Sequence, residues 1–331
     1  IDLLVIASPN HLHTPTLLRW AKHDLTILVE KPVAVNKEQI SQLRQLSQHP
    51  EWNARIWVAM EYRFIPAIAK LISLLPTVGE IKMVTIRENR YPFLHKINGW
   101  NRNLANTGDS LVEKCCHFFD LFRLITGQEA KLSKVRAIAQ RGLNYETEEP
   151  VPDQQPIIDS AFVTLPFKKV SSHDGAIDDR WKNTIGCLEL CMYAEGSRHQ
   201  EEVIVTGTKG RLEAYLPENK VYMYQRPSHK TWNDRSVPPP VDSIGRHVFD
   251  CTNVKEVHGI DDCDLPTHGG YHYSSTGVEW YYLLSELRKH KRTGTFKPQV
   301  SLEDGIRAVE IGLKATSAIV NNLDDDDDDE D

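Results

Sequence analysis

The sequence predicts an α/β arrangement followed by an α+β arrangement: a small parallel sheet, then a large, mostly antiparallel sheet with helices on one face. Two observations predict this order. Residues 1–34 contain an apolar strand, a polar turn, a helix and a second apolar strand, which together make the βαβ unit of a parallel sheet. From residue 131 onward, strand-like segments follow one another between turn residues, as in an antiparallel sheet.

The first domain is expected to continue with a helix, a strand and another helix. Asn36 is a good helix cap, and Ile40, Leu43 and Leu46 recur at the spacing of one helix face. Pro66 suits the first turn of the helix that follows the strand. These three elements are predicted over residues 36–48, 55–59 and 66–75.

The second domain is expected to begin at Gly79, because residues 81–89 alternate as a strand does. This divides the chain into residues 1–78 and residues 79–320. A hairpin turn is predicted at residues 207–210, between two of the later strands. The later strands are predicted over residues 131–140, 157–166, 184–193, 202–206, 211–215 and 220–225.

The last third of the chain has one long segment without clear periodicity. Residues 217–267 are rich in proline and are expected to form a lid or an irregular connection. Helices are predicted over residues 275–290 and 302–320. Residues 321–331 are expected to be a disordered, solvating acidic tail, with partner binding as the alternative.

The composition excludes several classes of protein. The formal net charge is −7, but residues 324–331 are eight acids in a row, and without them 39 basic residues face 38 acidic ones. A nearly neutral folded part predicts no nucleic-acid partner. Six cysteines in 331 residues do not suggest a disulfide framework, and no signal peptide or membrane-spanning run occurs. The sequence therefore predicts a soluble, cytoplasmic protein without a membrane partner.

The tripeptide Glu30-Lys31-Pro32 ends the second apolar strand. Ligands of open α/β sheets bind at the carboxyl ends of strands, so Lys31 is expected to face a cleft. Burial and a nearby cationic ring would lower the pKa of this lysine and suit it to proton transfer. The alternative is a surface pair of Glu30 and Lys31 at a strand end.

A second informative stretch covers residues 108–120. Ser110 and Glu113 have the spacing of a capping box, so Glu113 either caps the helix or takes part in chemistry. Glu113 lies four residues before His117, and Asp120 lies three residues after it, so all three share a helix face. An imidazole oriented by a carboxylate suits proton transfer near neutral pH. No metal site is expected, because adjacent Cys115, Cys116 and His117 point to different sides of a helix.

These two stretches, together with Ser8-Pro9-Asn10 and His13 before the first helix, resemble the family of glucose–fructose oxidoreductase, inositol dehydrogenase and rhizopine-catabolism proteins (Gfo/Idh/MocA). The resemblance covers residues 1 to about 320. It implies a Rossmann-type parallel sheet domain followed by a substrate domain, a closing helix that returns to the first domain, and homo-oligomerisation through the large sheet.

The resemblance also implies roles for individual residues. Lys31, His117 and Glu113 would form the catalytic group, with Asp120 orienting the histidine. Arg63 either lies near the cofactor or forms a salt bridge, and Arg102 either binds a substrate hydroxyl or carboxylate or pins its own loop. Cofactor-binding residues would be Ser8, Pro9, Asn10, His13, Glu30, Lys31 and Arg63. Substrate-binding residues would be Trp100, Arg102, Lys114, Asp120, His268 and His272.

The implied cofactor is NAD or NADP. The family's glycine fingerprint, G-x-G-x-x-G, has no match in these 331 residues. We therefore expect an amino-terminally truncated member with an incomplete Rossmann-type domain, and the pyrophosphate site is in doubt. The implied activity is hydride transfer to or from a small-molecule substrate that is a sugar, a polyol or a related cyclic alcohol or carbonyl. The alternatives are a non-catalytic sensor or scaffold and an NAD-dependent glycosidase.

Overall fold

The structure is a computed structural model that describes residues 2–94, 96–142, 156–168, 183–226, 246–260 and 272–324. It contains two sheets, and the smaller one is parallel. Its strand order is β1 (Leu3–Ile6), β2 (Thr26–Glu30) and β3 (Ile56–Ala59). Helices α1 (His13–Trp20), α2 (Lys37–Leu46) and α3 (Pro50–Asn53) accompany it. The predicted βαβ unit is therefore confirmed, as are the cap at Asn36 and the buried face of α2.

The larger sheet has nine strands in the described part of the chain. Its strand order is β12-β11-β10-β9-β4-β8-β7-β5, and β6 pairs with β7. All its neighbours are antiparallel except β4 and β8, which run parallel. The strands are β4 (Ile81–Asn89), β5 (Glu129–Ala130), β6 (Arg136–Arg141), β7 (Ile158–Lys168), β8 (Ile185–Cys191), β9 (Glu201–Gly207), β10 (Gly210–Leu216), β11 (Lys220–Gln225) and β12 (Arg246–Asp250). The predicted fold class is confirmed.

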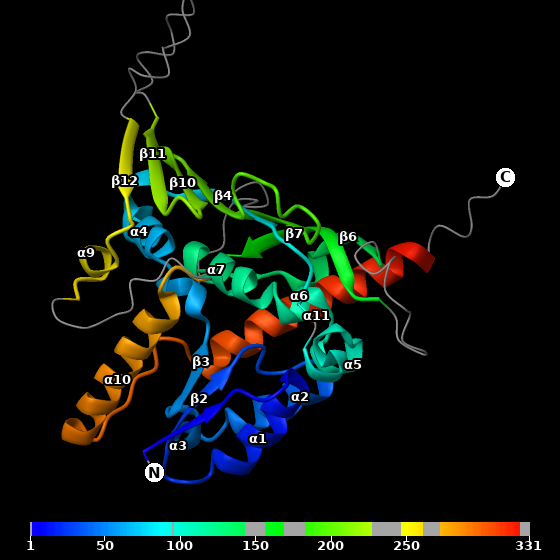
Figure 1. The fold of residues 1–331 in the computed structure, drawn as a ribbon, viewed down its shortest axis with the longest axis vertical. Helices are drawn as coiled ribbons and strands as arrows, with labels where there is room; N and C mark the ends of the chain where they lie inside the picture. Colours follow the sequence, from blue (N-terminus) through cyan, green and yellow to red (C-terminus); the bar gives the residue numbers. More distant parts are fainter. Residues whose placement is uncertain are drawn as a thin grey trace, which may run out of the picture.

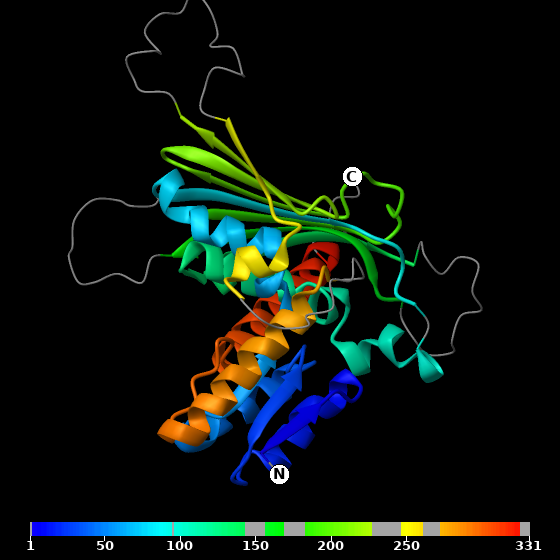
Figure 2. The same ribbon diagram turned by 60° about the vertical axis from the view of Figure 1, so that its left-hand side comes forward.

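Helices α4 (Pro66–Leu74) and α7 (Cys116–Thr126) lie against one face of the large sheet, the face toward the small sheet, with α9 (Val254–His258) beside α4 (Figures 1 and 2). The short helices α5 (Leu104–Thr107) and α6 (Ser110–Glu113) precede α7, and α11 (Leu302–Asp324) runs between the two sheets. Helix α10 (Ser275–Thr293) lies beside β3, where Glu279 accepts a hydrogen bond from the Trp57 indole N–H. Short 3-10 helices add η1 (Asn10–Leu12), η2 (Glu61–Phe64), η3 (Leu75–Val78), η4 (Ile97–Arg102) and η5 (Leu132–Lys134).

Helix α11 contacts elements of both the small-sheet part and the large-sheet part of the chain. A Cβ atom on Gly305 would lie 2.9 Å from Val33 Cγ1, and one on Gly312 would lie 2.6 Å from the Leu111 carbonyl oxygen. Each glycine therefore lets the helix backbone come close, on one side to the small sheet and on the other to α6. The helix continues to Asp324, so the expected tail begins later than residue 321.

The predicted capping box at Ser110 is wrong. The residue that caps α6 is Asp109, whose Oδ1 accepts hydrogen bonds from the backbone N–H groups of Ser110 and Ile158, each at 2.8 Å. Ser110 is the first helical residue, and its hydroxyl donates to the Ile158 carbonyl. The expected single helix is also two, because α6 ends at Glu113 and α7 begins at Cys116.

Two other expectations differ from the structure. The strand predicted over residues 131–140 begins only at Arg136, as β6, because η5 occupies residues 132–134; the short strand β5 lies before the predicted segment. The segment 217–267 contains β12 and α9 in addition to β11, although it was expected to be irregular beyond residue 225. Strand β12 lies at the sheet edge and is mostly exposed, so its sequence lacks the alternation that marks a half-buried strand.

Candidate active site

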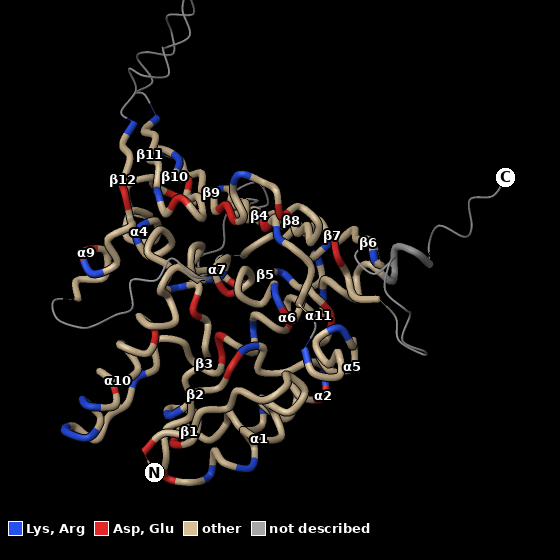
Figure 3. Tube along the Cα trace, viewed as in Figure 1, with Lys and Arg blue, Asp and Glu red and all other residues tan. Residues whose placement is uncertain are grey.

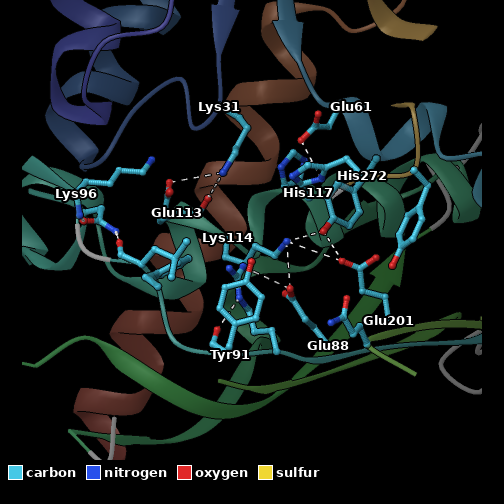
Figure 4. Close-up of a pocket in the computed structure, with 17 residues that line it drawn as sticks. Lys31, Glu61, Glu88, Tyr91, Lys96, Glu113, Lys114, His117, Glu201 and His272 are labelled. Atoms are coloured by element: carbon cyan, nitrogen blue, oxygen red, sulfur yellow. Dashed lines mark hydrogen bonds and ion pairs between the residues drawn. The ribbon is translucent and has the colours of Figure 1, made fainter. Parts of the chain in front are cut away.

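A cavity of about 270 Å³ lies where the two units meet, in front of the carboxyl ends of β2 and β3. Figure 4 shows side chains entering it from both units, and Figure 3 shows basic and acidic residues interspersed in this region. Four basic and four acidic residues of the described chain line it. They are Lys31, Arg90, Lys96 and Lys114, and Glu61, Glu88, Glu113 and Glu201.

Lys31 reaches this cavity from the end of β2, as predicted, and the peptide bond to Pro32 that follows is cis. Its Nζ donates to the Glu113 carbonyl oxygen at 3.0 Å and lies 3.7 Å from Glu113 Oε2. Burial alone would lower the pKa of Lys31, but the negative charges around it, first that of Glu113, raise the pKa above its ordinary value. The expectation of a lowered pKa is wrong for the chain by itself.

Glu113 is held by the first unit. Its Oε2 accepts a hydrogen bond from Asn10 Nδ2 at 2.5 Å, and both residues are buried. Asn10 begins η1, directly after the turn that follows β1. Glu113 is therefore turned toward Asn10 and Lys31, away from the backbone N–H groups that a capping residue would bind.

His117 lines the same cavity from α7 and is buried. Its ring stacks on Tyr62 with centroids 4.4 Å apart, and its Nδ1 has no hydrogen-bond partner among the described residues. Burial lowers its pKa well below the ordinary value, and the positive charges of Lys31 and Lys114 add to this. The imidazole is therefore neutral at physiological pH and can accept a proton.

Arg63 and Asp120 bind each other. Arg63 Nε and Nη2 donate to the two Asp120 carboxylate oxygens at 2.6 Å and 2.5 Å. Arg63 also donates to the Gln299 carbonyl and lies 3.4 Å from Asp304. The salt-bridge alternative for Arg63 is thus the one observed, and the carboxylate expected to orient His117 is engaged by the guanidinium.

The turn after β1 is tightly held. His13 places Nδ1 2.8 Å from the Pro32 carbonyl and Nε2 2.7 Å from the Ser8 carbonyl, so both ring nitrogens are engaged within the chain. Pro9 accepts a hydrogen bond from the Leu12 N–H at 2.9 Å. Ser8 Oγ is buried and has no hydrogen-bond partner in the part of the chain that the structure describes.

Glu30 ends β2 beside this turn, and burial raises the pKa of its carboxyl, with Lys31 opposing the rise. Glu30 lies at the carboxyl end of the central strand, and its contact with a cofactor stays a prediction.

Of the remaining residues predicted to bind substrate, some line the cavity and others do not. Arg102 donates through Nε and Nη2 to the Phe93 carbonyl, at 3.2 Å and 2.7 Å, so it pins its loop. Trp100 carries Lys96 Nζ over its ring at 4.7 Å, and neither Arg102 nor Trp100 is among the described lining residues. His272 lines the cavity, with Nδ1 3.1 Å from Glu61 Oε1. His268 lies outside the described residues.

The floor of the cavity holds a polar cluster that the sequence prediction missed, apart from Lys114. Lys114 Nζ lies 3.1 Å from Glu88 Oε1 and donates to the Tyr62 hydroxyl, which in turn donates to Glu201. A signal for Glu88 exists in the sequence. Strand β4 buries Val84 and Ile86, so a glutamate two residues further lies on the same, inward face.

No group of three or more potential metal ligands occurs among the described residues. Within the same residues, no helix is both long and apolar enough to cross a bilayer.

Comparison with known proteins identifies the class. Residues 77–321 match the oxidoreductase family's C-terminal alpha/beta domain, and residues 1–54 match its NAD-binding Rossmann fold. The chain belongs to this oxidoreductase family, Gfo/Idh/MocA, as the resemblance predicted.

The individual proteins to which the chain is similar share less than 30% of their residues with it over the matched length. Over 132 residues, 39% of this chain, it is 28% identical to inositol 2-dehydrogenase of Rhizobium meliloti, and the match spans only 38% of that protein. Levoglucosan dehydrogenase in complex with NADH and levoglucosan has a similar fold, with a TM-score of 0.71 and 18% identity over 97% of this chain and 79% of that one. An NAD-binding oxidoreductase from Klebsiella pneumoniae gives a TM-score of 0.71 and 20% identity, with the same coverage.

Proposed function

We propose that the chain forms the reaction site of an NAD- or NADP-dependent oxidoreductase that transfers hydride between nicotinamide and a sugar, polyol or related cyclic alcohol or carbonyl. The observation that carries the proposal is the meeting of Lys31, Glu113 and His117 in one cavity at the carboxyl end of a parallel strand. Family membership supports the cofactor class, and the names of the relatives support the substrate class.

The residues around the small sheet fit one end of such a cofactor. The Ser8 Oγ, which is buried and has no hydrogen-bond partner among the described residues, is suited to bind a ribose or amide group, and Asn10, Glu30 and Lys31 lie at the same ends of β1 and β2. These residues would hold the nicotinamide half. The chain's sequence has no G-x-G-x-x-G turn for the pyrophosphate, so no phosphate contact is assigned to it.

The different protonation states of His117 and Lys31 give them different roles in the proposed reaction. A bound nicotinamide would supply the hydride acceptor for the oxidation of an alcohol, and the hydroxyl proton of that alcohol would have to pass to a base. The neutral His117 is able to accept that proton, while the ammonium of Lys31 donates a hydrogen bond to the oxygen as the C=O bond forms. Glu113 keeps Lys31 charged and in place.

The balance of charge in the cavity wall favours an uncharged substrate. Each cation except Lys96 has a carboxylate oxygen of the wall within 4.0 Å: Lys31 has Glu113, and both Arg90 and Lys114 have Glu88. An anionic substrate would have to compete with these pairs for the cations. A polyol can donate to the carboxylates and accept from the ammonium groups without disturbing them.

We also propose that a second copy of the chain covers the open face of the large sheet. This face carries apolar side chains that are more than half exposed, which is unusual for a sheet surface in contact with water. They include Met83, Ile138, Phe162 and Ile185. Light scattering of the purified protein should give the mass of a dimer or a larger oligomer, and a monomer at micromolar concentration would contradict this part of the proposal.

The function is tested by incubating the protein with NAD⁺ or NADP⁺ and a panel of neutral polyols and sugars while NADH or NADPH is measured. Cofactor-dependent reduction with at least one polyol is expected. Release of product from a glycoside without net NADH would indicate the glycosidase alternative instead. Cofactor or sugar binding by calorimetry without turnover of any substrate would indicate a sensor or scaffold.

A further inference from the structure

His117, the proposed base, is not bound by the carboxylate that the sequence suggested would orient it. Asp120 is bound by Arg63, and Glu113 is bound by Asn10 and Lys31. Some other group must hold the imidazole in place, because a base that rotates freely loses its alignment with the proton it takes.

Tyr62 is in contact with the full face of the imidazole. The two rings are 4.4 Å apart at their centroids and inclined by 26°. Tyr62 is buried in η2, directly after β3, and the edge contact of Phe118 at 5.5 Å supports its ring from the side. The stacked Tyr62 ring therefore restricts the orientation of the His117 imidazole.

The tyrosine itself is fixed at its hydroxyl. Lys114 Nζ donates to this oxygen at 2.5 Å and also lies 4.6 Å from the centre of the ring, and the hydroxyl donates to Glu201. Lys114 is held in turn by Glu88 at 3.1 Å. Burial raises the pKa of the Tyr62 phenol well above its ordinary value, so the hydroxyl remains a donor. One cluster thus joins η2, the α6–α7 junction, β4 and β9.

We propose that Tyr62, clamped at its hydroxyl by Lys114 and Glu201, is the positioning residue of His117. The inference rests on the proposed function only for the tests that measure turnover. The contact between Tyr62 and His117 is present in the folded chain whether or not the protein turns over a substrate.

The same cluster sets the charge around the imidazole. The titratable groups that face His117 across the cavity are the basic residues Lys31, Arg90, Lys114 and His272 and the acidic residues Glu61, Glu88, Glu113 and Glu201. Lys114 lowers the pKa of His117, so removing its charge raises that pKa. If neutral His117 is the base, the acid limb of the pH–rate profile then moves to higher pH.

The test compares four variants of the full chain. Tyr62→Leu removes the ring contact, Tyr62→Phe removes only the clamp, Lys114→Met removes the charge, and Lys289→Met removes an exposed charge on α10 as the control. We expect kcat to fall on the order of 10- to 100-fold in Tyr62→Leu and less in Tyr62→Phe. The acid limb should move to higher pH in Lys114→Met, and Lys289→Met should match the wild type.

Titration of the histidine rings by NMR gives a readout that needs no substrate. The His117 ring signal should shift in Tyr62→Phe and titrate at higher pH in Lys114→Met. If Tyr62→Leu does not fold, these two variants carry the test. A His117 signal and an acid limb that stay at wild-type values in both would overturn the inference. A wild-type protein that oxidises no polyol but shows these NMR changes would refute the proposed function and leave the contact standing.

Discussion

Asn10 and Glu113 lie 103 positions apart in the chain and are joined by a hydrogen bond of 2.5 Å between Asn10 Nδ2 and Glu113 Oε2. Both side chains are buried, so the bond connects the turn after β1 to the short helix α6 without competition from water. Because Lys31 Nζ also binds Glu113, this one residue brings together three segments at the cavity.

Loss of the Asn10 amide should therefore destabilise the protein. Asn10→Ala removes the donor and leaves a buried carboxylate with fewer partners, so we expect the free energy of unfolding to fall by about 1.5–3 kcal/mol. Urea unfolding of Asn10→Ala, Glu113→Ala and the double variant measures the coupling between the two residues. Purely additive effects would show that the bond contributes nothing to stability.

The ion pair of Arg63 and Asp120 should be far more sensitive than an exposed pair. In Asp120→Asn the buried guanidinium of Arg63 loses its closest negative charge and keeps, among the described residues, the more distant Asp304 carboxylate and a backbone carbonyl, so we expect a loss of about 3–5 kcal/mol. The control is Asp24→Asn, which breaks the pair of Arg55 with a fully exposed Asp24 and should cost less than about 1 kcal/mol. Equal costs for the two variants in denaturant unfolding would contradict the assigned burial.

Stability should fall as pH rises toward neutrality because of Glu201. Burial raises the pKa of Glu201 to about 7, with Lys114 opposing the rise. The folded state therefore binds this proton more tightly than the unfolded state does, and the contribution to stability is present below the unfolded pKa and is lost as pH rises through about 7.

Unfolding free energies measured from pH 4.5 to 8 for the wild type and Glu201→Gln check this dependence. The wild type should lose stability relative to the variant across this range, since the amide cannot ionise. A difference between the two proteins that is constant with pH would count against the raised pKa.

The fold was largely predictable because its strands and helices follow local patterns. Burial alternates from Met83 to Asn89 in β4, and the apolar spacing after Asn36 describes α2. Strand β12 was not predicted because an exposed edge strand has no buried face, and its sequence therefore shows no alternation of apolar and polar residues.

The site was predictable only in part. Lys31 and His117 are placed by local motifs, and both line the cavity. By contrast, the role of Glu113 depends on Asn10, and the engagement of Asp120 depends on Arg63, 57 positions earlier. Such partners are set by packing between distant segments, which short-range spacing does not encode. The cap of α6 was also missed: it is Asp109, with a φ of 81°, and it lies one residue before the expected Ser110.

The proposed chemistry requires Lys31 and His117 to act on the same reacting oxygen. This is tested by kcat of Lys31→Met and His117→Ala with the preferred cofactor and the best polyol, beside Lys289→Met as an exposed charge control. We expect each site variant to lose about 10²- to 10⁴-fold in kcat while circular dichroism shows a retained fold, and we expect the control to match the wild type. Wild-type kcat in both site variants would contradict the claim.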